Sequence, residues 1–395
     1  MKKIPLLILS IIILFTSCKN DQPTLAERGD IVGKPNVIGS YSPLEIQGML
    51  ESKNFDVPFN LTYDIQVVKI AYMTPDPGGK LVAASGAILY PVKDGSLPMI
   101  SFQHGTQTHQ YLVPSRGPGN SEASLAGSVA ASMGYIVVAA DYLGLGDSQL
   151  VPPYLINATS ANTVIDLLRA AQTWLIDAGI ALDGSLYLTG YSQGGIVTMA
   201  AHHEIEQNYS TEFQVTASAP LAGAYDLSLT IDSILSWESY IEPVLIANLL
   251  YSYDYYYDWD RMGGFFKAEY ASAIPEYFDG TLTLDGINNE LTETIADLLQ
   301  EQFISDYLAG SETDLDQALT DNSLLTYTPS APVRFFYGEA DRTVPPQNTL
   351  AAKAYYEANG KTDVSSTSIP GLNHEDAAAP AIIGAMTWFE ELRGK

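Results

Sequence analysis

Short, almost continuously apolar stretches recur along this chain, and segments with helical spacing of apolar residues separate them. The clearest helical segment is apolar at positions 164, 167, 168, 171, 174 and 175 and polar at 166, 169 and 172. Strands that are apolar on both faces are typical of a parallel sheet with helices on both sides. The pattern therefore predicts an α/β fold with a mostly parallel central sheet. The expected strands are residues 98–102, 135–140, 215–222, 333–337 and 364–369, and further helices are expected at residues 124–133, 347–359 and 377–392.

An antiparallel hairpin is predicted ahead of this alternation. Residues 63–72 and 81–92 are both strand-like, and the sequence P-D-P-G-G at 75–79 lies between them. Proline, aspartate and glycine at these positions favour a tight turn. We expect these two strands to lie at the edge of the sheet.

The alternation stops after residue 222 and resumes only at residue 333. Residues 225–328 are therefore expected to be an insertion, mainly helical, that caps the functional site, while residues 36–224 and 329–395 form the two parts of the core. A Tyr-rich stretch at 251–259 lies in the insertion. Its aromatic side chains could contact a substrate, but packing between helices is the simpler explanation.

The N-terminus has the composition of an export signal. Lys2 and Lys3 precede an apolar run at 4–15, which is too short to span a bilayer comfortably and ends in small residues. Residues 1–17 followed by Cys18 resemble a bacterial lipoprotein signal, with an ordinary cleaved signal as the alternative. The resemblance implies a lipidated Cys18, a tether at residues 18–35, and an exported, membrane-anchored protein at the outer membrane or cell surface.

The overall charge is strongly acidic, with 46 Asp and Glu against 19 Lys and Arg, for a formal net charge of −27. Such a chain is repelled by nucleic acid and by anionic bilayers, so neither is an expected partner. Cys18 is the only cysteine, which rules out an intrachain disulfide. The sequence also has no Gly-rich phosphate loop and no His/Cys cluster, so no cofactor and no metal are expected.

A candidate nucleophile, Ser192, lies in the sequence L-Y-L-T-G-Y-S-Q-G-G at 186–195. An apolar strand ends at this G-x-S-x-G pattern, and a helix is expected to follow. Glycines two residues away on either side allow the sharp turn that exposes a nucleophilic serine hydroxyl. The backbone N–H of Gln193 would lie at the helix N-terminus, where an unpaired donor can stabilise an oxyanion.

The base that such a serine needs can be chosen among five histidines. His202 and His203 lie about ten residues along the following helix, roughly 15 Å from the serine. His104 and His109 belong to a loop after an earlier strand. His374 follows the last expected strand, on a loop that a parallel sheet places at its carboxyl edge beside the serine. His374 is therefore the predicted base.

The acid that orients the base is expected to be Asp341, which follows the strand at 333–337. Asp226 is the rival, because it follows the preceding strand. The order Ser192, Asp341, His374 is the nucleophile, acid and base order of one known hydrolase fold.

Taken together, these residues resemble the α/β-hydrolase superfamily, and the resemblance covers residues 97–395. The segments D-Y-L-G-L-G at 141–146, P-P-Y-L at 152–155 and G-Y-S-Q-G-G at 190–195 are similar to its secretory-lipase and carboxylesterase branch. The resemblance implies an α/β-hydrolase fold and cleavage of a small-molecule carboxylic ester through an acyl-enzyme. It also implies that the second oxyanion N–H comes from Thr106.

Two other functions are consistent with parts of the sequence. Proline-specific aminopeptidases use the same triad and an inserted cap whose carboxylates hold the substrate amine, and Asp and Glu are frequent between 232 and 312. A non-catalytic surface binding protein would also tolerate a hydrolase scaffold, but it would not require the complete serine, acid and base set.

Replacing Cys18 with alanine is expected to release the protein from membranes, because processing and acylation of a lipoprotein both require the thiol. Fractionation of cells that express the wild type or Cys18→Ala, followed by immunoblotting, measures this release. Membrane association that persists in the variant would instead indicate an uncleaved anchor or a peripheral contact.

Overall fold

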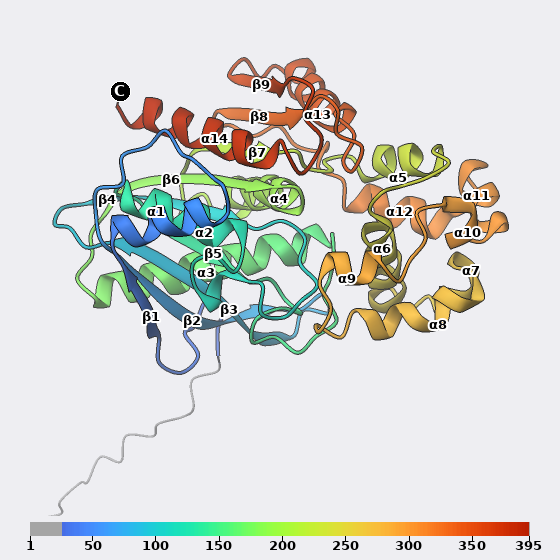
Figure 1. Cartoon of the computed structure of the whole chain (residues 1–395), viewed down its shortest axis with the longest axis horizontal. Coiled ribbons are helices and arrows are strands. Elements are labelled where there is room, and N and C mark those ends of the chain that lie inside the picture. The colour runs from blue at the N-terminus through green and yellow to red at the C-terminus, as the bar shows by residue number, and fades with distance from the viewer. Residues whose placement is uncertain (1–25, 395) are drawn as a thin grey trace, which may run out of the picture.

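The computed structural model describes residues 26–394, so the proposed signal at residues 1–17 and Cys18 lie outside the described residues (Figure 1). The described strands form one nine-stranded sheet in the order β1-β2-β3-β5-β4-β6-β7-β8-β9. They are β1 (Asn36–Tyr41), β2 (Ile65–Pro75), β3 (Leu81–Pro91), β4 (Leu97–Gln103), β5 (Ile136–Ala140), β6 (Leu182–Tyr191), β7 (Val215–Leu221), β8 (Val333–Gly338) and β9 (Val364–Ile369).

The sheet is mostly parallel, as the continuous apolar strands predicted. β5, β4, β6, β7, β8 and β9 pair in parallel, whereas β1, β2, β3 and the β3–β5 junction are antiparallel. Every residue of β4 and β5 is buried. Such strands need cover on both faces, which fixes the layered architecture.

The hairpin of β2 and β3 forms as predicted, but its expected place at the edge was wrong. β1 pairs antiparallel with β2 and forms that edge of the sheet. The register shifts between Val37 and Gly39, so β1 is irregular as well as short. Its half-exposed residues lack the apolar run that identified the other strands, which explains why the sequence pattern missed it.

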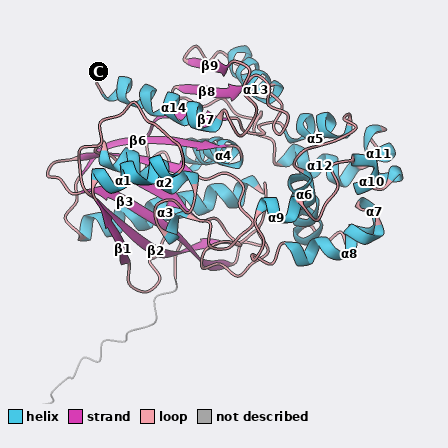
Figure 2. Ribbon diagram, viewed as in Figure 1, coloured by secondary structure: helices cyan, strands magenta, loops and turns pink. Residues whose placement is uncertain are grey.

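Helices cover both faces of the sheet (Figure 2). On one face, Ile46, Leu125 and Phe389 belong to a single buried cluster. On the other, Leu168 and Val197 belong to a second and larger cluster. The first face carries α1 (Pro43–Ser52), α2 (Glu122–Ser132) and α14 (Ala378–Arg393), and the second carries α3 (Asn157–Asp177), α4 (Gln193–Asn208) and α13 (Gln347–Ala358).

Eight helices lie between β7 and β8, where the sequence predicted a mainly helical insertion. They gather at one end of the molecule (Figure 1). These helices are α5 (Leu227–Leu235), α6 (Pro243–Tyr256), α7 (Met262–Phe265), α8 (Ala268–Tyr277), α9 (Leu284–Asn288), α10 (Ile295–Leu298), α11 (Glu301–Leu308) and α12 (Thr313–Asp321).

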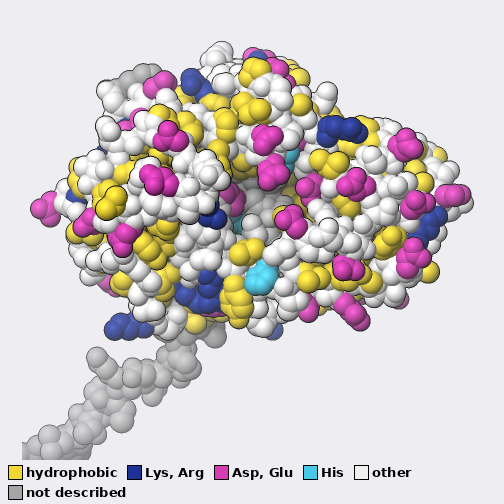
Figure 3. Space-filling view, in the orientation of Figure 1, with side chains coloured by type: hydrophobic (Ala, Val, Ile, Leu, Met, Phe, Trp, Pro, Cys, Tyr) yellow, Lys and Arg dark blue, Asp and Glu magenta, His cyan; other side chains and the backbone are white. Residues whose placement is uncertain are grey.

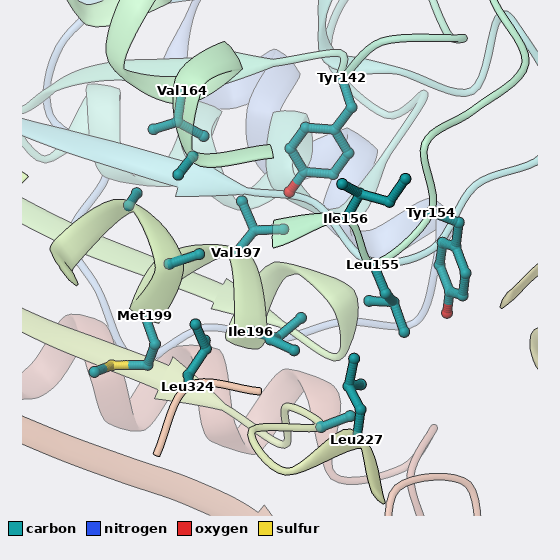
Figure 4. Close-up of a cluster of buried hydrophobic side chains, with 14 of the residues drawn as sticks. Tyr142, Tyr154, Leu155, Ile156, Val164, Ile196, Val197, Met199, Leu227 and Leu324 are labelled. Carbon is teal, nitrogen blue, oxygen red and sulfur yellow. The ribbon is translucent and has the colours of Figure 1, made fainter. Parts of the chain in front are cut away.

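The inserted helices share a hydrophobic cluster with the core. Leu227 and Leu324 of the insertion belong to the same cluster as Ile196 and Val197 of α4 (Figure 4). Burial of each such side chain contributes about 1.5–3 kcal/mol to the free energy of unfolding, so this cluster stabilises the packing of the insertion against the core.

Tyrosines of the 251–259 stretch also join the insertion to the core. The Tyr253 hydroxyl donates to Leu155 O at 3.1 Å, and the Tyr256 hydroxyl donates to Val151 O. Both acceptors lie in the loop before α3. These two side chains therefore have the packing role that was the simpler explanation for the Tyr-rich stretch.

Part of the expected tether at residues 18–35 is instead bound to the core. The Gly29 N–H donates to Met73 O at 2.8 Å, and Ile31 forms an antiparallel bridge with Tyr72, so this segment pairs with the second half of β2. Arg28 Nε lies 3.1 Å from both carboxylate oxygens of Asp166, whose side chain is fully buried in α3. The polar composition that suggested a tether was therefore misleading for Arg28, because its charge neutralises a buried carboxylate.

Arg28→Ala is expected to lower the free energy of unfolding by about 2 kcal/mol, because Asp166 loses a charged hydrogen-bond partner and keeps only Arg169. Chemical denaturation followed by circular dichroism measures the change. The matched control is Lys353→Ala, which removes a surface ion pair with Glu357 at 2.6 Å and should cost less than about 0.5 kcal/mol. Equal effects of the two substitutions would contradict a structural role for the Arg28 segment.

Candidate active site

Ser192 occupies a sharp turn between the end of β6 and the start of α4. Its backbone has φ 59° and ψ −118°, in the left-handed half of conformational space. A residue with a side chain adopts such a conformation only when its surroundings impose it, at a cost of about 1–3 kcal/mol. The turn therefore fixes the position of the Ser192 hydroxyl at the carboxyl end of the strand.

Glycines around Ser192 allow neighbouring backbones to approach the turn. A Cβ on Gly190 would lie 2.3 Å from Gln103 O, and one on Gly194 would lie 2.1 Å from the same oxygen. A Cβ on Gly195 would lie 2.4 Å from Leu221 O. These distances are far inside van der Waals contact, and the opposing atoms are backbone. Only glycine is therefore compatible with the turn at these three positions.

The structure brings the three predicted catalytic residues into one hydrogen-bonded chain. His374 Nε2 lies 2.8 Å from Ser192 Oγ, and His374 Nδ1 lies 2.6 Å from Asp341 Oδ2. The Asp341 side chain is almost fully buried, whereas the His374 side chain keeps 15% of its exposure. The imidazole can therefore be reached from outside while its acidic partner is shielded from water.

Further hydrogen bonds hold Asp341 and His374 in place. Asp341 Oδ1 accepts the N–H groups of Thr343 at 2.9 Å and Val344 at 2.8 Å. The Tyr191 hydroxyl donates to the backbone carbonyl of His374. One carboxylate oxygen is thus occupied by the loop, which leaves the other directed at the imidazole.

Asp226, the rival acid, has a different place. Its side chain caps the N-terminus of α5 by accepting the Leu229 N–H at 3.1 Å. Asp341 follows β8 and His374 follows β9, and the parallel sheet brings both strand ends to the edge where β6 ends. Asp226 follows β7, which ends at the same edge, but its carboxylate caps α5, whereas the carboxylate of Asp341 lies 2.6 Å from His374 Nδ1.

Thr106 and Gln193, the expected oxyanion donors, lie at the ends of neighbouring strands. β4 and β6 pair in parallel with Gln103 opposite Gly190, so Thr106 lies three residues beyond the level of that pair. Gln193 directly follows Ser192. Among the turn and loop hydrogen bonds of residues 26–394, neither backbone N–H donates to a backbone carbonyl. Both donors are therefore available to an external oxygen.

Several hydrogen bonds hold the loop that carries Thr106. The Tyr142 hydroxyl donates to His104 O at 3.0 Å, and the two rings stack with centroids 4.1 Å apart. The Gly105 N–H donates to Glu122 Oε1, and the Thr106 hydroxyl lies 3.0 Å from the Tyr154 hydroxyl. A loop held in this way does not need to reorganise when a negative charge develops beside it.

Glu122 and Asp141 support this loop, and neither was predicted to do so, although Asp141 begins the D-Y-L-G-L-G segment at 141–146. Asp141 is fully buried, accepts from Ser85 Oγ at 2.5 Å and from the Ser115 N–H at 2.9 Å, and burial raises the pKa of its carboxyl. An acidic residue directly after an apolar strand was an available signal for Asp141. Glu122 gave no such signal, because its partner Gly105 is 17 residues away in the sequence.

The remaining histidines lie elsewhere or have other partners. His202 is buried in α4, with its ring nitrogens 2.7 Å from Ser218 Oγ and 3.0 Å from Glu206 Oε1. Burial lowers the pKa of His203 to about 4. His104 is buried in the loop before Thr106, and His109 accepts the Tyr111 N–H. Elimination of these four as the base is consistent with their contacts.

The surface is hollowed between the core and the inserted helices, and acidic side chains surround the hollow (Figure 3).

Within residues 26–394, no group of three or more His, Cys, Asp or Glu side chains is arranged to bind a metal ion. In the same part of the chain, no helix has the length and hydropathy needed to cross a membrane.

Comparisons with known proteins agree with this architecture. The family model of the secretory lipases matches residues 125–393. A hydrolase-like protein from Legionella pneumophila is 26% identical, with a TM-score of 0.84 over 92% of this chain and 98% of that chain. The rice cell wall degrading esterase LipA from Xanthomonas oryzae is 29% identical, with a TM-score of 0.79 over 90% and 95% of the two chains.

A more distant structure shares the fold alone. Candida antarctica lipase A in its closed state is 13% identical, with a TM-score of 0.68 over 93% of this chain and 82% of that chain. No curated protein matches the chain. The fold expected from the resemblance to α/β-hydrolases is thus confirmed.

Asp341→Asn is expected to lower kcat for a p-nitrophenyl ester by about 10³- to 10⁴-fold, because His374 loses the partner that sets its tautomer and orientation. Asp226→Asn is the matched control, since it removes the same charge from a helix cap and should change kcat little. Steady-state kinetics on both variants measures the difference. The opposite ranking of the two variants would show that the acid has been misassigned.

Proposed function

The chain belongs to the secretory lipase family and is a carboxylesterase or lipase-like hydrolase, and from this premise we propose that it cleaves carboxylic esters through an acyl-enzyme on Ser192. His374 acts as general base and acid, and Asp341 orients it. The observation that carries this proposal is the pair of hydrogen bonds from Ser192 Oγ to His374 Nε2, at 2.8 Å, and from His374 Nδ1 to Asp341 Oδ2, at 2.6 Å.

In the first half of the reaction, Ser192 Oγ attacks the ester carbonyl carbon while its proton moves to His374 Nε2. The carbonyl oxygen becomes an oxyanion, for which the N–H groups of Thr106 and Gln193 are the donors. When the intermediate collapses, the bond from carbon to the alcohol oxygen breaks. That oxygen takes the proton from His374 Nε2, and the acyl group remains on Ser192.

In the second half, water replaces the alcohol. His374 Nε2 takes a proton from the water as its oxygen attacks the acyl carbon, and a second oxyanion forms. Collapse of this intermediate breaks the bond to Ser192 Oγ, which recovers its proton from His374. The acid leaves, and the enzyme returns to its starting state.

Electrostatic stabilisation supports both steps. The buried Asp341 carboxylate stabilises the imidazolium that forms at His374 in each half-reaction. Each oxyanion donor in such a site contributes about 2.7–4 kcal/mol to the transition state. The Thr106 loop is already held by Glu122, Tyr142 and Tyr154, so this contribution requires little rearrangement.

For the location of the activity, we propose an exported protein held at a membrane by a lipid on Cys18. Membership of a secretory family supports export. The acidic chain, with a net charge of −27, gives no electrostatic attraction to an anionic bilayer. Membrane contact would therefore depend on the lipid, and the substrate would be a small-molecule ester outside the cytoplasm.

Of the other functions that the sequence left open, a non-catalytic binding protein is not supported, because the chain belongs to a family of enzymes. The aminopeptidase hypothesis requires cap carboxylates that hold a substrate amine. Glu242 lies at the start of α6 and is half-buried. Burial raises the pKa of its carboxyl above the usual value, although the hydrogen bond from Asn288 and the charge of His374 act in the opposite direction. Asn288 donates to Oε2 of this carboxyl only, so Glu242 is the residue by which the aminopeptidase hypothesis can be tested. Membership of the secretory lipase family supports the ester as the proposed substrate.

Ser192→Ala is expected to lower kcat for p-nitrophenyl butyrate by about 10⁴-fold or more, because the nucleophile is removed. The melting temperature should not fall, since the hydroxyl makes no contact that the fold needs beyond His374. Labelling with a fluorophosphonate should likewise be lost. Turnover that is retained in the variant would exclude the proposed mechanism.

The comparison with a peptide analogue uses the same preparations. The wild type should have a higher kcat/KM for p-nitrophenyl butyrate than for proline p-nitroanilide, because an amine must be protonated and held as it leaves. A better anilide substrate would replace the ester proposal, and Glu242→Gln would then test whether the cap binds the amine.

A further inference from the structure

The loop after β4 contacts the inserted helices as well as the core. The Thr108 hydroxyl donates to Leu282 O at 2.8 Å, and the Gln110 N–H donates to Gly280 O at 2.8 Å. Both acceptors lie between α8 and α9, in residues 279–282, which we call the insertion turn. Thr108 keeps only 2% of its exposure, so little water competes for its hydroxyl.

The insertion turn is held in shape by its own hydrogen bonds. Asp279 Oδ1 accepts the N–H of Thr281 at 2.8 Å and the hydroxyl of the same residue at 2.6 Å. Thr283 follows the turn and caps α9 by accepting the Gly286 N–H at 3.1 Å. Phe278, which precedes the turn, is buried among the inserted helices. The carbonyls that face the loop therefore have fixed positions relative to the insertion.

Gly280 allows the insertion turn to approach the loop closely. Its φ of 90° lies in the left-handed region, which favours glycine, and a Cβ at this position would lie 3.3 Å from Gln110 Cβ. Gln110 is also bound to the core, because its carbonyl accepts the Gly146 N–H at 3.2 Å. A side chain at position 280 would therefore strain the turn and push it away from the loop.

The expected oxyanion donor lies between the parts of the loop that the core and the insertion hold. On the core side, the Gly105 N–H donates to Glu122 and the Thr106 hydroxyl lies 3.0 Å from the Tyr154 hydroxyl. Thr108, which contacts the insertion, is only two residues further along the chain. The position of the Thr106 N–H therefore depends on both contacts.

We propose that the insertion turn is part of the scaffold of the oxyanion hole and that Thr108 is a positioning residue, which fixes the Thr106 N–H relative to Ser192. The inference rests on the proposed function, because it needs an oxyanion that Thr106 stabilises. Groups of this kind must be held within about 0.5 Å of their working positions. The insertion thus supports the reaction itself in addition to covering the site.

Thr108→Val tests this role, since it removes the hydroxyl and keeps the branched shape. It should lower kcat for p-nitrophenyl butyrate about tenfold and leave KM within about twofold, because complete loss of an oxyanion donor costs about 10²- to 10³-fold in kcat. Inactivation by a fluorophosphonate should slow by the same factor, since its phosphoryl oxygen needs the same donors. Thr108→Ser, which keeps the hydroxyl, should restore kcat to within about twofold of the wild type.

Tyr256→Phe is the matched control, because it also removes one hydrogen bond between the insertion and the core, at Val151 O. Its melting temperature should fall about as much as that of Thr108→Val, whereas its kcat should stay at the wild-type level. An unchanged kcat in Thr108→Val would overturn the proposal. An equal loss of kcat in both variants would also overturn it, since the effect would then follow stability.

Gly280→Ala tests the same contact from the insertion and should lower kcat by a similar factor. Its control is Gly310→Ala, where φ is 69° and an added Cβ would have no neighbour within 4 Å. This control adds the backbone strain without touching the loop. If Thr108→Val lost its melting transition, this pair would decide, and equal kcat values for the two alanine variants would overturn the proposal.

Amide hydrogen exchange separates this inference from the proposed mechanism, because it needs no turnover. In Thr108→Val, exchange should become faster both in residues 279–283 and at Gly105, on the far side of Thr106, whereas Tyr256→Phe should change neither. Faster exchange in the insertion turn alone would overturn the positioning role. Turnover that is retained in Ser192→Ala would overturn the proposed function and leave the exchange result standing.

Discussion

The close approach of three backbone segments at the Ser192 turn is the constraint on which the site depends. The carbonyl of Gln103 at the end of β4 lies where a Cβ of Gly190 or Gly194 would be, and the Leu221 carbonyl at the end of β7 lies where a Cβ of Gly195 would be. This packing holds Ser192 at φ 59° and keeps the start of α4 in contact with the sheet. The strain is stable because both neighbouring strands are buried and paired along their length.

The same parallel arrangement explains why the chemistry is preassembled. Loops after β4, β6, β8 and β9 all leave the sheet at one edge, so Thr106, Ser192, Asp341 and His374 meet there without any long-range adjustment. Buried polar contacts then hold each loop separately, with Glu122 on the first and the Thr343 and Val344 amides on the third. In the proposed reaction, charge that develops during ester cleavage is thus met by groups whose positions were set by folding.

Much of this could be predicted from the sequence, for a physical reason. Strands buried on both faces need continuous apolar runs, and the serine turn needs glycines, so both produce local patterns that can be recognised in the sequence. The edge strand β1 and the Arg28 segment have no such pattern. A half-exposed strand, and a charged residue whose partner Asp166 is distant in the sequence, have the same local composition as a polar linker. Glu122 was missed in the same way, since its role depends on Gly105 and not on its own neighbours.

The sequence by itself determined the α/β alternation, the nucleophile turn and the chain order of serine, acid and base, because each depends on residues within a few positions of one another or on their order along the chain. Only the tertiary structure distinguishes Asp341 from Asp226 as the partner of His374, since both follow core strands and only the first lies 2.6 Å from the imidazole. It also decided where an apolar groove lined by Phe59, Leu125 and Ile382 lies, because its walls come from the segment after α1, from α2 and from α14, which are far apart in the chain. Distances of this kind depend on how strands are ordered in the sheet, and that order is set by packing across the whole core.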